Sequence, residues 1–239
     1  YVDGILRNDS GSNNSSSAEI GGDNAGSTFA FGGYGLTGGS PSEFWYGHMD
    51  ELRISNTARY TGDFTPTKTK FVKDNQTTLL IHADQPNNSV TFTSDEVKSH
   101  LIAPVSDVKH SNYIAKVGTS SIRHTNSNGV LNIADHAQWD FGTNFTVEGW
   151  FRFDQFSNKK NIIAHNGGSN SWGNINFYMQ TDTNNVVQVC CGYAGNAGVT
   201  VDSTTQLQVN TWYHIAMIKE GNKLSVAING TIEASATGT

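Results

Sequence analysis

The strongest constraint on the fold is an alternation of apolar and polar side chains with a period of two residues. Within residues 145–153, positions 145, 147, 151 and 153 are apolar, whereas Thr146, Glu148 and Arg152 lie between them. Successive side chains of a β-strand point to opposite faces of the sheet, so this pattern predicts a strand with one buried face. Further runs with strand character occupy residues 78–83, 175–180, 186–191, 212–219 and 224–228.

Turn sequences separate these runs. Asn-Gly pairs at 128–129, 166–167 and 229–230, together with Glu-Gly-Asn at 220–222, are typical of tight turns between strands. Charged residues make up only 15% of the chain, and 25 glycines accompany many Ser, Thr and Asn residues. No run of residues shows the 3.6-residue spacing of an amphipathic helix. We therefore expect an all-β protein with less than about a tenth of its residues in helices.

The charge and hydropathy of the chain exclude several classes of function. The net charge is −6, and the 15 Lys and Arg residues are scattered, so we expect no binding of nucleic acid. No run approaches the roughly 18 apolar residues of a membrane span, and no charged-then-apolar leader opens the chain. Because Tyr1 stands in the middle of a strand pattern, the chain is interpreted as part of something longer.

The two cysteines are adjacent in the sequence. On a strand, the side chains of Cys190 and Cys191 would point to opposite faces. We expect one buried and one outward thiol, with a vicinal disulfide or a metal site as the alternatives.

The two ends of the chain resemble each other. Residues 224–232 form an apolar run interrupted by Asn229-Gly230, and residues 1–6 have the same shape around Asp3-Gly4. If Gly230 and Gly4 are equivalent, the repeat length is 230 − 4 = 226 residues. A repeat of this length is a whole domain rather than a solenoid unit. We therefore predict an array of similar modules that the chain enters in the middle of one copy.

Four stretches together carry a resemblance to a known family. Residues 47–60 (GHMDELRISNTARY) resemble the closing strand of laminin-G-like, concanavalin-type jelly rolls, and residues 145–150 (FTVEGW) resemble their central strand. Residues 210–216 (NTWYHIA), followed by Asn229-Gly230, are similar to the signature near the middle of the domain, and residues 78–84 to its opening strand. Residues 56–66 are also similar to modules repeated in large virion proteins of marine bacteriophages.

The resemblance implies an all-β, concanavalin-like or laminin-G-like jelly-roll β-sandwich. On this interpretation, residues 1–65 are the C-terminal third of one laminin-G-like module and residues 66–239 are the N-terminal two-thirds of the next. Two outcomes are then open, because the N-terminal piece either packs onto its own chain or completes a neighbouring module or subunit of the same assembly. An unpaired apolar strand edge promotes association, and we favour completion by neighbouring sequence.

Asp50 is the first candidate metal ligand. Strict alternation would place it on the same face as Leu52 and Ile54, where a buried carboxylate needs a strong partner. A Ca²⁺ ion is one such partner, whereas Arg53 or backbone N–H groups at a strand bulge are the alternatives. The resemblance implies Ca²⁺ where the first and last strands meet, with Asp84 and Asp95 as further ligands.

Aromatic side chains are the candidates for ligand contact. Trp45, Tyr46 and Trp172 lie in segments rich in Gly, Ser and Asn, where we expect exposure to solvent. Trp150 either lines a concave groove, where its ring would stack on a sugar, or packs under a loop or at the sandwich edge. His214 and Trp212 share a strand face and are interpreted as packing residues.

The sequence shows none of the common catalytic patterns. It has no pair of strand carboxylates arranged as in related jelly-roll glucanases, no Gly-x-Ser-x-Gly elbow and no zinc or phosphate-loop motif. We therefore expect a non-catalytic structural or adhesive module, on a virion surface or otherwise extracellular, that contacts neighbouring modules and cell-surface glycans. The alternative is a carbohydrate-binding accessory module of an extracellular bacterial enzyme or adhesin.

Overall fold

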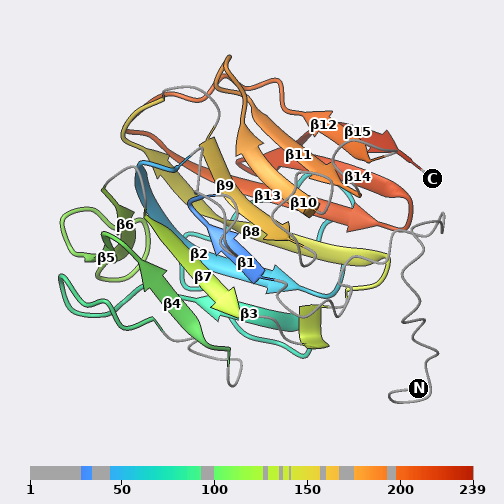
Figure 1. Cartoon of the computed structure of the whole chain (residues 1–239). Helices are drawn as coiled ribbons and strands as arrows, with labels where there is room; N and C mark the ends of the chain where they lie inside the picture. Colours follow the sequence, from blue (N-terminus) through green and yellow to red (C-terminus); the bar gives the residue numbers. More distant parts are fainter. Residues whose placement is uncertain are drawn as a thin grey trace.

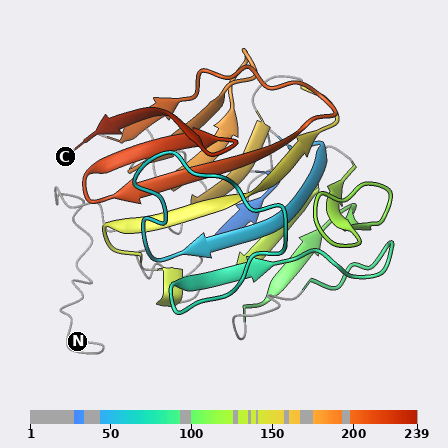
Figure 2. The same cartoon turned by 180° about the vertical axis from the view of Figure 1, so that it is seen from behind.

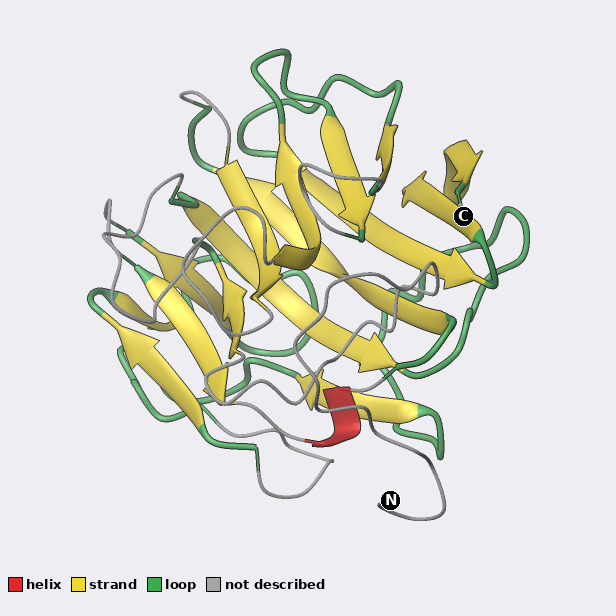
Figure 3. Cartoon of the chain, turned by 45° about the vertical axis from the view of Figure 1, so that its right-hand side comes forward, coloured by secondary structure: helices red, strands yellow, loops and turns green. Residues whose placement is uncertain are grey.

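The structure is a computed structural model, and it consists of two antiparallel β-sheets packed face to face (Figure 1). The only helix within the described part of the chain is the short 3-10 turn η1 (Ala137–Trp139), which Figure 3 shows in red beside the strands. The prediction of an all-β fold is confirmed for these residues. None of their helices is long and apolar enough to span a membrane. The described residues are 28–33, 44–92, 100–125, 129–134, 137–139, 141–156, 160–166, 175–192 and 198–238.

The first sheet has seven strands in the order β12-β11-β10-β9-β1-β7-β4. It forms the front layer in Figure 1. Its strands are β1 (Thr28–Phe31), β4 (Ile102–Val105), β7 (Val130–Ala134), β9 (Lys160–Asn166), β10 (Ile175–Thr181), β11 (Val187–Cys191) and β12 (Val199–Asp202).

The second sheet has eight strands, seven of them in the order β15-β14-β13-β8-β2-β6-β5, while β3 pairs with β2 beside β6. Its strands are β2 (Gly47–Ser55), β3 (Thr77–Ile81), β5 (Val108–Ser111), β6 (Ser121–His124), β8 (Asn144–Phe153), β13 (Trp212–Glu220), β14 (Lys223–Ile228) and β15 (Thr231–Thr237).

The apolar side chains of the alternating strands fill the space between the two sheets. Phe145, Val147, Phe151 and Phe153 of β8 all belong to the core between the sheets, which confirms the alternation in this strand; Thr146 and Glu148 on its other face are buried as well, so the expectation of a single buried face is wrong. Aromatic rings from both sheets meet there, and the rings of Phe145 and Phe177 are 5.3 Å apart. Burial of such large apolar side chains is the main force that holds the sheets together.

The N-terminal part of the chain supplies interior strands to both sheets. β1 lies between β7 and β9, and β2 lies between β8 on one side and β3 and β6 on the other. The N-terminal piece therefore packs onto its own chain, so the completion by neighbouring sequence that we favoured is not the arrangement in this structure. The origin of residues 1–65 and 66–239 from consecutive copies of a repeat stays a prediction.

A bulge in β2 changes which side chains face the core. Glu51 has φ = 51°, and the pairing with β8 shifts between Asp50 and Arg53. One extra residue in a strand reverses the alternation beyond it. Leu52 and Ile54 do lie in the core, but Asp50 pairs with Trp150 on the outer face of the eight-stranded sheet. The expectation that Asp50 shares a face with Leu52 and Ile54 is therefore wrong.

Residues 56–76, which we call the strap, cross the outer face of the eight-stranded sheet (Figure 2). The Phe64 N–H donates to the Gly230 carbonyl at 2.7 Å, and the Ile232 N–H donates to Asp63 Oδ1 at 2.8 Å. Arg59 donates to both carboxylate oxygens of Asp74, at 2.8 and 2.7 Å. The first two bonds hold the middle of the strap against the sheet, and the ion pair joins the two ends of the strap to each other.

A buried charge network lies between the strap and the sheet. Arg53 donates two hydrogen bonds to Oε1 of Glu148, at 2.8 and 2.5 Å, and the hydroxyl of Tyr60 in the strap donates to Oε2 at 2.8 Å. Nε2 of the buried His214 is 3.2 Å from the same Oε2, although the two atoms are poorly aligned for a hydrogen bond. Burial alone would raise the pKa of Glu148, but its contacts with His214 and Arg53 hold the pKa below the usual value.

Both cysteines are free and buried. Cys191 lies in the core between the sheets, whereas Cys190 packs with Ala164 and Tyr178 on the outer face of the seven-stranded sheet. The expected placement on opposite faces is confirmed, but the outward thiol of Cys190 is covered.

We predict that Arg53→Met lowers the free energy of unfolding by about 3–5 kcal/mol, because it leaves the Glu148 carboxylate in the interior without its cation. Urea denaturation would measure the loss. Tyr60→Phe, which removes only one hydrogen bond to the same carboxylate, should cost about 1 kcal/mol. Equal effects of the two substitutions would contradict a dominant role for the buried ion pair.

Candidate functional site

An open hollow lies at the edge of the sandwich, where two loops meet. Residues 83–89 follow β3, and residues 111–120 lead from the end of β5 to β6; together we call them the rim. The hollow is lined by a carboxylate, three amide side chains, a hydroxyl and a proline: Asp84, Gln85, Asn87, Asn112, Thr119 and Pro86. Loops held by a rigid scaffold are common positions for binding residues.

Buried polar side chains fix the first loop of the rim. The ring of His110, which is 1% exposed, lies with Nδ1 2.9 Å from the carbonyl of Ala83 and Nε2 3.1 Å from that of Thr91. The hydroxyl of Ser120 contacts the carbonyls of Ala83 and Gln85, at 2.5 and 2.8 Å. The loop is therefore held from beneath by groups on β5 and just before β6.

Asp84 joins the two loops of the rim to the strap. Its Oδ1 accepts from the backbone N–H of Thr119 at 2.7 Å, and its Oδ2 is 2.5 Å from Nζ of Lys70. Gly118 has φ = 71°, and a Cβ atom there would lie 2.2 Å from Asp84 Oδ1. Only glycine fits at this position while the carboxylate keeps its place.

Asp50 supports the second loop from the interior. Its side chain is fully buried, and Oδ2 accepts from the N–H groups of Lys116 and Val117 at 2.8 and 2.9 Å. Its other oxygen, Oδ1, is buried without a hydrogen-bond partner. Burial raises the pKa of Asp50 to about 8, against the opposing effect of the two N–H donors. Backbone N–H groups, one of the alternatives open at Asp50, are thus its partners here.

Asp50 and Asp84 are the two predicted calcium ligands that the structure describes. Asp50 Oδ1 and Asp84 Oδ2 are both buried without a hydrogen-bond partner of suitable geometry, but Asp84 Oδ2 forms an ion pair with Nζ of Lys70, which places a positive charge where a cation would bind. The described part of the chain contains no group of three His, Cys, Asp or Glu side chains that could hold a metal ion. Asp95 lies outside the described residues. Calcium binding therefore stays a prediction.

None of the predicted ligand-binding aromatic residues that the structure describes lines the hollow. Trp45 is 0% exposed, with its ring 3.9 Å from that of Phe153, so its expected exposure is wrong. Tyr46 is half-buried, and Nζ of Lys160 lies 5.1 Å from its ring centroid. Trp172 lies outside the described residues.

Trp150 packs on the outer face of the eight-stranded sheet, as the loop-covered alternative predicted. Its side chain is 5% exposed, and Nζ of Lys116, from the second rim loop, lies 4.1 Å from its ring. Its ring also meets that of His214 edge-on at 5.3 Å. This contact supports the interpretation of His214 as a packing residue, although its Nδ1 has no hydrogen-bond partner.

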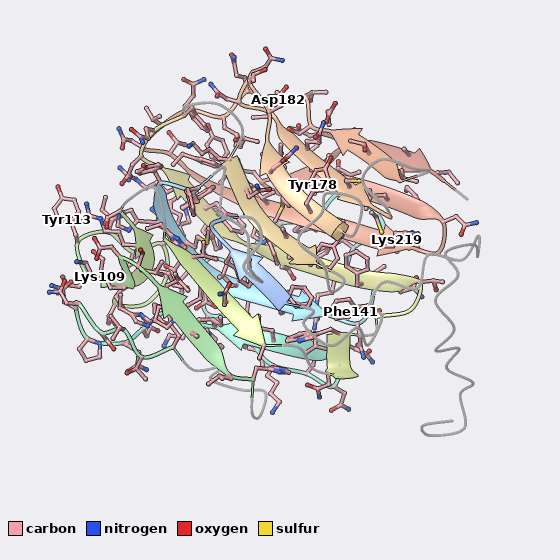
Figure 4. The ribbon with its side chains drawn as sticks, viewed as in Figure 1. Lys109, Tyr113, Phe141, Tyr178, Asp182 and Lys219 are labelled. Carbon is pink, nitrogen blue, oxygen red and sulfur yellow. The ribbon has the colours of Figure 1, made fainter. Side chains whose placement is uncertain are left out.

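Sequence reasoning missed Asn112 and Tyr113 of the second loop. Tyr113 is 81% exposed, the highest value among the exposed large apolar and aromatic side chains of the described residues. Figure 4 shows it at the outer edge of the molecule, beside the residues of β5. The sequence around it, Ser111-Asn-Tyr-Ile, has no periodic pattern that would identify it.

We predict that Asp50→Asn stabilises the protein increasingly as the pH rises. The folded protein keeps the Asp50 proton up to about pH 8, whereas the unfolded chain loses it near pH 4, so ionisation of Asp50 lowers the free energy of unfolding across this interval. The free energy of unfolding of the variant should rise relative to that of the wild type by at most about 1.4 kcal/mol per pH unit. Urea denaturation between pH 5 and 9 would measure this, with Asp202→Asn as an exposed control; a gain that does not depend on pH would refute it.

Comparison with known proteins agrees with this geometry. Residues 125–239 match the family model Laminin_G_3, described as the concanavalin A-like lectin/glucanases superfamily. Neither the curated proteins nor the solved structures gave a match. The matched residues contain β8 and β13, two central strands of the eight-stranded sheet, together with most of the seven-stranded sheet. Residues 125–239 are therefore similar to the concanavalin A-like lectin/glucanases superfamily, and the two-sheet sandwich is a jelly roll of the concanavalin-like, laminin-G-like type.

Proposed function

We propose that this protein is a non-catalytic carbohydrate-binding or adhesive module and that the rim is its binding site. The observation that carries the proposal is the chemistry of the hollow, where a carboxylate, amides and a hydroxyl line an open surface. Such groups both donate and accept hydrogen bonds, as sugar hydroxyls require. The exposed ring of Tyr113 directly follows Asn112 and offers an apolar face with a polar end.

The buried carboxylates support a binding role over a hydrolytic one. Glycoside hydrolysis uses two carboxyl groups on either side of the sugar bond. Glu51 and Glu148 are both at most 1% exposed. Glu51 accepts from the Phe71 N–H at 2.6 Å and contacts His82 at 2.8 Å, whereas Glu148 is held by Arg53. These two carboxylates therefore bind groups inside the protein.

The proposal also covers the location of the module and its partners. The similarity of residues 56–66 to repeated modules of phage virion proteins supports a place on a virion surface, and an extracellular location is the broader form of the proposal. The partners would be neighbouring modules and a glycan of the host surface.

We predict that a glycan array identifies at least one bound carbohydrate, and that Tyr113→Ala weakens its binding by about tenfold, because stacking on an aromatic ring contributes on the order of 1 kcal/mol. Asn112→Ala should weaken binding in the same direction. Val209→Ala, at an exposed position in the loop before β13, serves as the control. Binding that survives both rim substitutions unchanged would place the site elsewhere, and an array without any bound glycan would contradict the proposed function.

The proposed calcium ion has its own test. If Ca²⁺ binds at Asp50 and Asp84, EDTA should lower the melting temperature, because a ligand that binds only the folded state stabilises it by mass action. Differential scanning fluorimetry in calcium and in EDTA would show this, and Asp84→Asn should abolish the difference. Equal melting temperatures in the two buffers would support a purely structural role for Asp50.

A further inference from the structure

Three lysines gather at the rim, although the chain has a net charge of −6. Lys68 and Lys70 belong to the strap, and Lys116 belongs to the second rim loop. The side chain of Lys70 is 54% exposed while it pairs with Asp84. Lys68 is exposed and stands two residues before Lys70 in the strap; burial, together with the charge of Lys68, lowers the pKa of Lys116.

The backbone brings these lysines to the same part of the surface. Asp84 binds Lys70 through one oxygen and the Thr119 N–H through the other. Lys116 is three residues before Thr119 in the same loop, and its N–H is fixed by Asp50. Its ammonium group rests 4.1 Å from the centre of the Trp150 ring, which holds the long side chain in place.

Among the described residues of this region, two of the three acidic side chains face the interior, and the third, Asp84, lines the hollow. Asp50 and Glu51 are 0% exposed. The side chain of Asp84 is 18% exposed, and its Oδ2 forms an ion pair with the ammonium group of Lys70. A ligand that approaches the rim therefore meets positive charge at the surface, next to the amides of the hollow.

We propose that the rim recognises an anionic glycan, with the three lysines contacting its carboxylate or sulfate groups and the amides of the hollow contacting its hydroxyls. This inference rests on the proposed function and adds the class of sugar to it. Contacts between an ammonium group and an anion are stronger than neutral hydrogen bonds, and salt screens them. A glycan fits better than a nucleic acid, because the hollow beside the lysines is lined by amide and hydroxyl groups.

The test compares dextran sulfate with neutral dextran, which share a backbone and differ in charge. We expect the full chain to bind dextran sulfate at least about tenfold more tightly in isothermal titration calorimetry, and less tightly as the salt concentration rises. The double variant Lys68→Gln/Lys116→Gln should lose about this factor, while Lys223→Gln in β14, which removes one charge away from the rim, should bind as the wild type does. Alginate, a carboxylated glycan, should follow dextran sulfate.

The outcomes separate this inference from the proposed function. If neutral glycans bind through Tyr113 and dextran sulfate binds no more tightly, the proposed function stands and the anionic specificity is refuted. If neither kind of glycan binds, both fail. Equal binding of dextran sulfate by the double variant, or equally tight binding of single-stranded DNA, would refute specific recognition by the lysines. Lys70→Gln is a second variant, and unchanged melting temperatures show that each variant is folded.

Discussion

The structure depends on partners for the ionisable side chains of β2. This strand is buried on both faces, yet it carries His48, Asp50, Glu51 and Arg53, each at most 8% exposed. A buried polar or charged group without a partner is costly, so each of these groups requires another segment nearby. The partners come from β6, the second rim loop, the strap, His82 just after β3, and β8. The polar side chains of one strand thus determine where these five segments pack.

These internal contacts determine the shape of the candidate site. The second rim loop directs the N–H groups of Lys116, Val117 and Thr119 inward, where the carboxylates of Asp50 and Asp84 accept them. The loop can then keep the side chain of Asn112 exposed without losing its position. Carboxyl acceptors below the loop and polar side chains at its surface are two consequences of the same backbone conformation, which Gly118 permits.

The sequence predicted the regular part of the fold better than the site. The alternation in β8 identified a strand correctly, because a sheet with one face on the core repeats every two residues. The bulge at Glu51 was not predicted, since no pattern marks a single non-glycine residue with positive φ, and Asp50 was therefore assigned to the wrong face. Trp45 was expected at the surface because its neighbours are small and polar, but long-range packing against Phe153 buries it. The rim itself joins loops that are distant in sequence, and local patterns carry no information about such contacts.

The central position of β2 also has a consequence for how the chain folds. Arg53 and its partner Glu148 are 95 residues apart in the sequence. During synthesis, β2 leaves the ribosome before any of the strands that flank it, and its apolar residues stay uncovered until β8 has been made. Contacts of such long range slow folding, because a long loop must close before they form. The strand that organises the finished molecule is therefore open to misassociation while the molecule is being made.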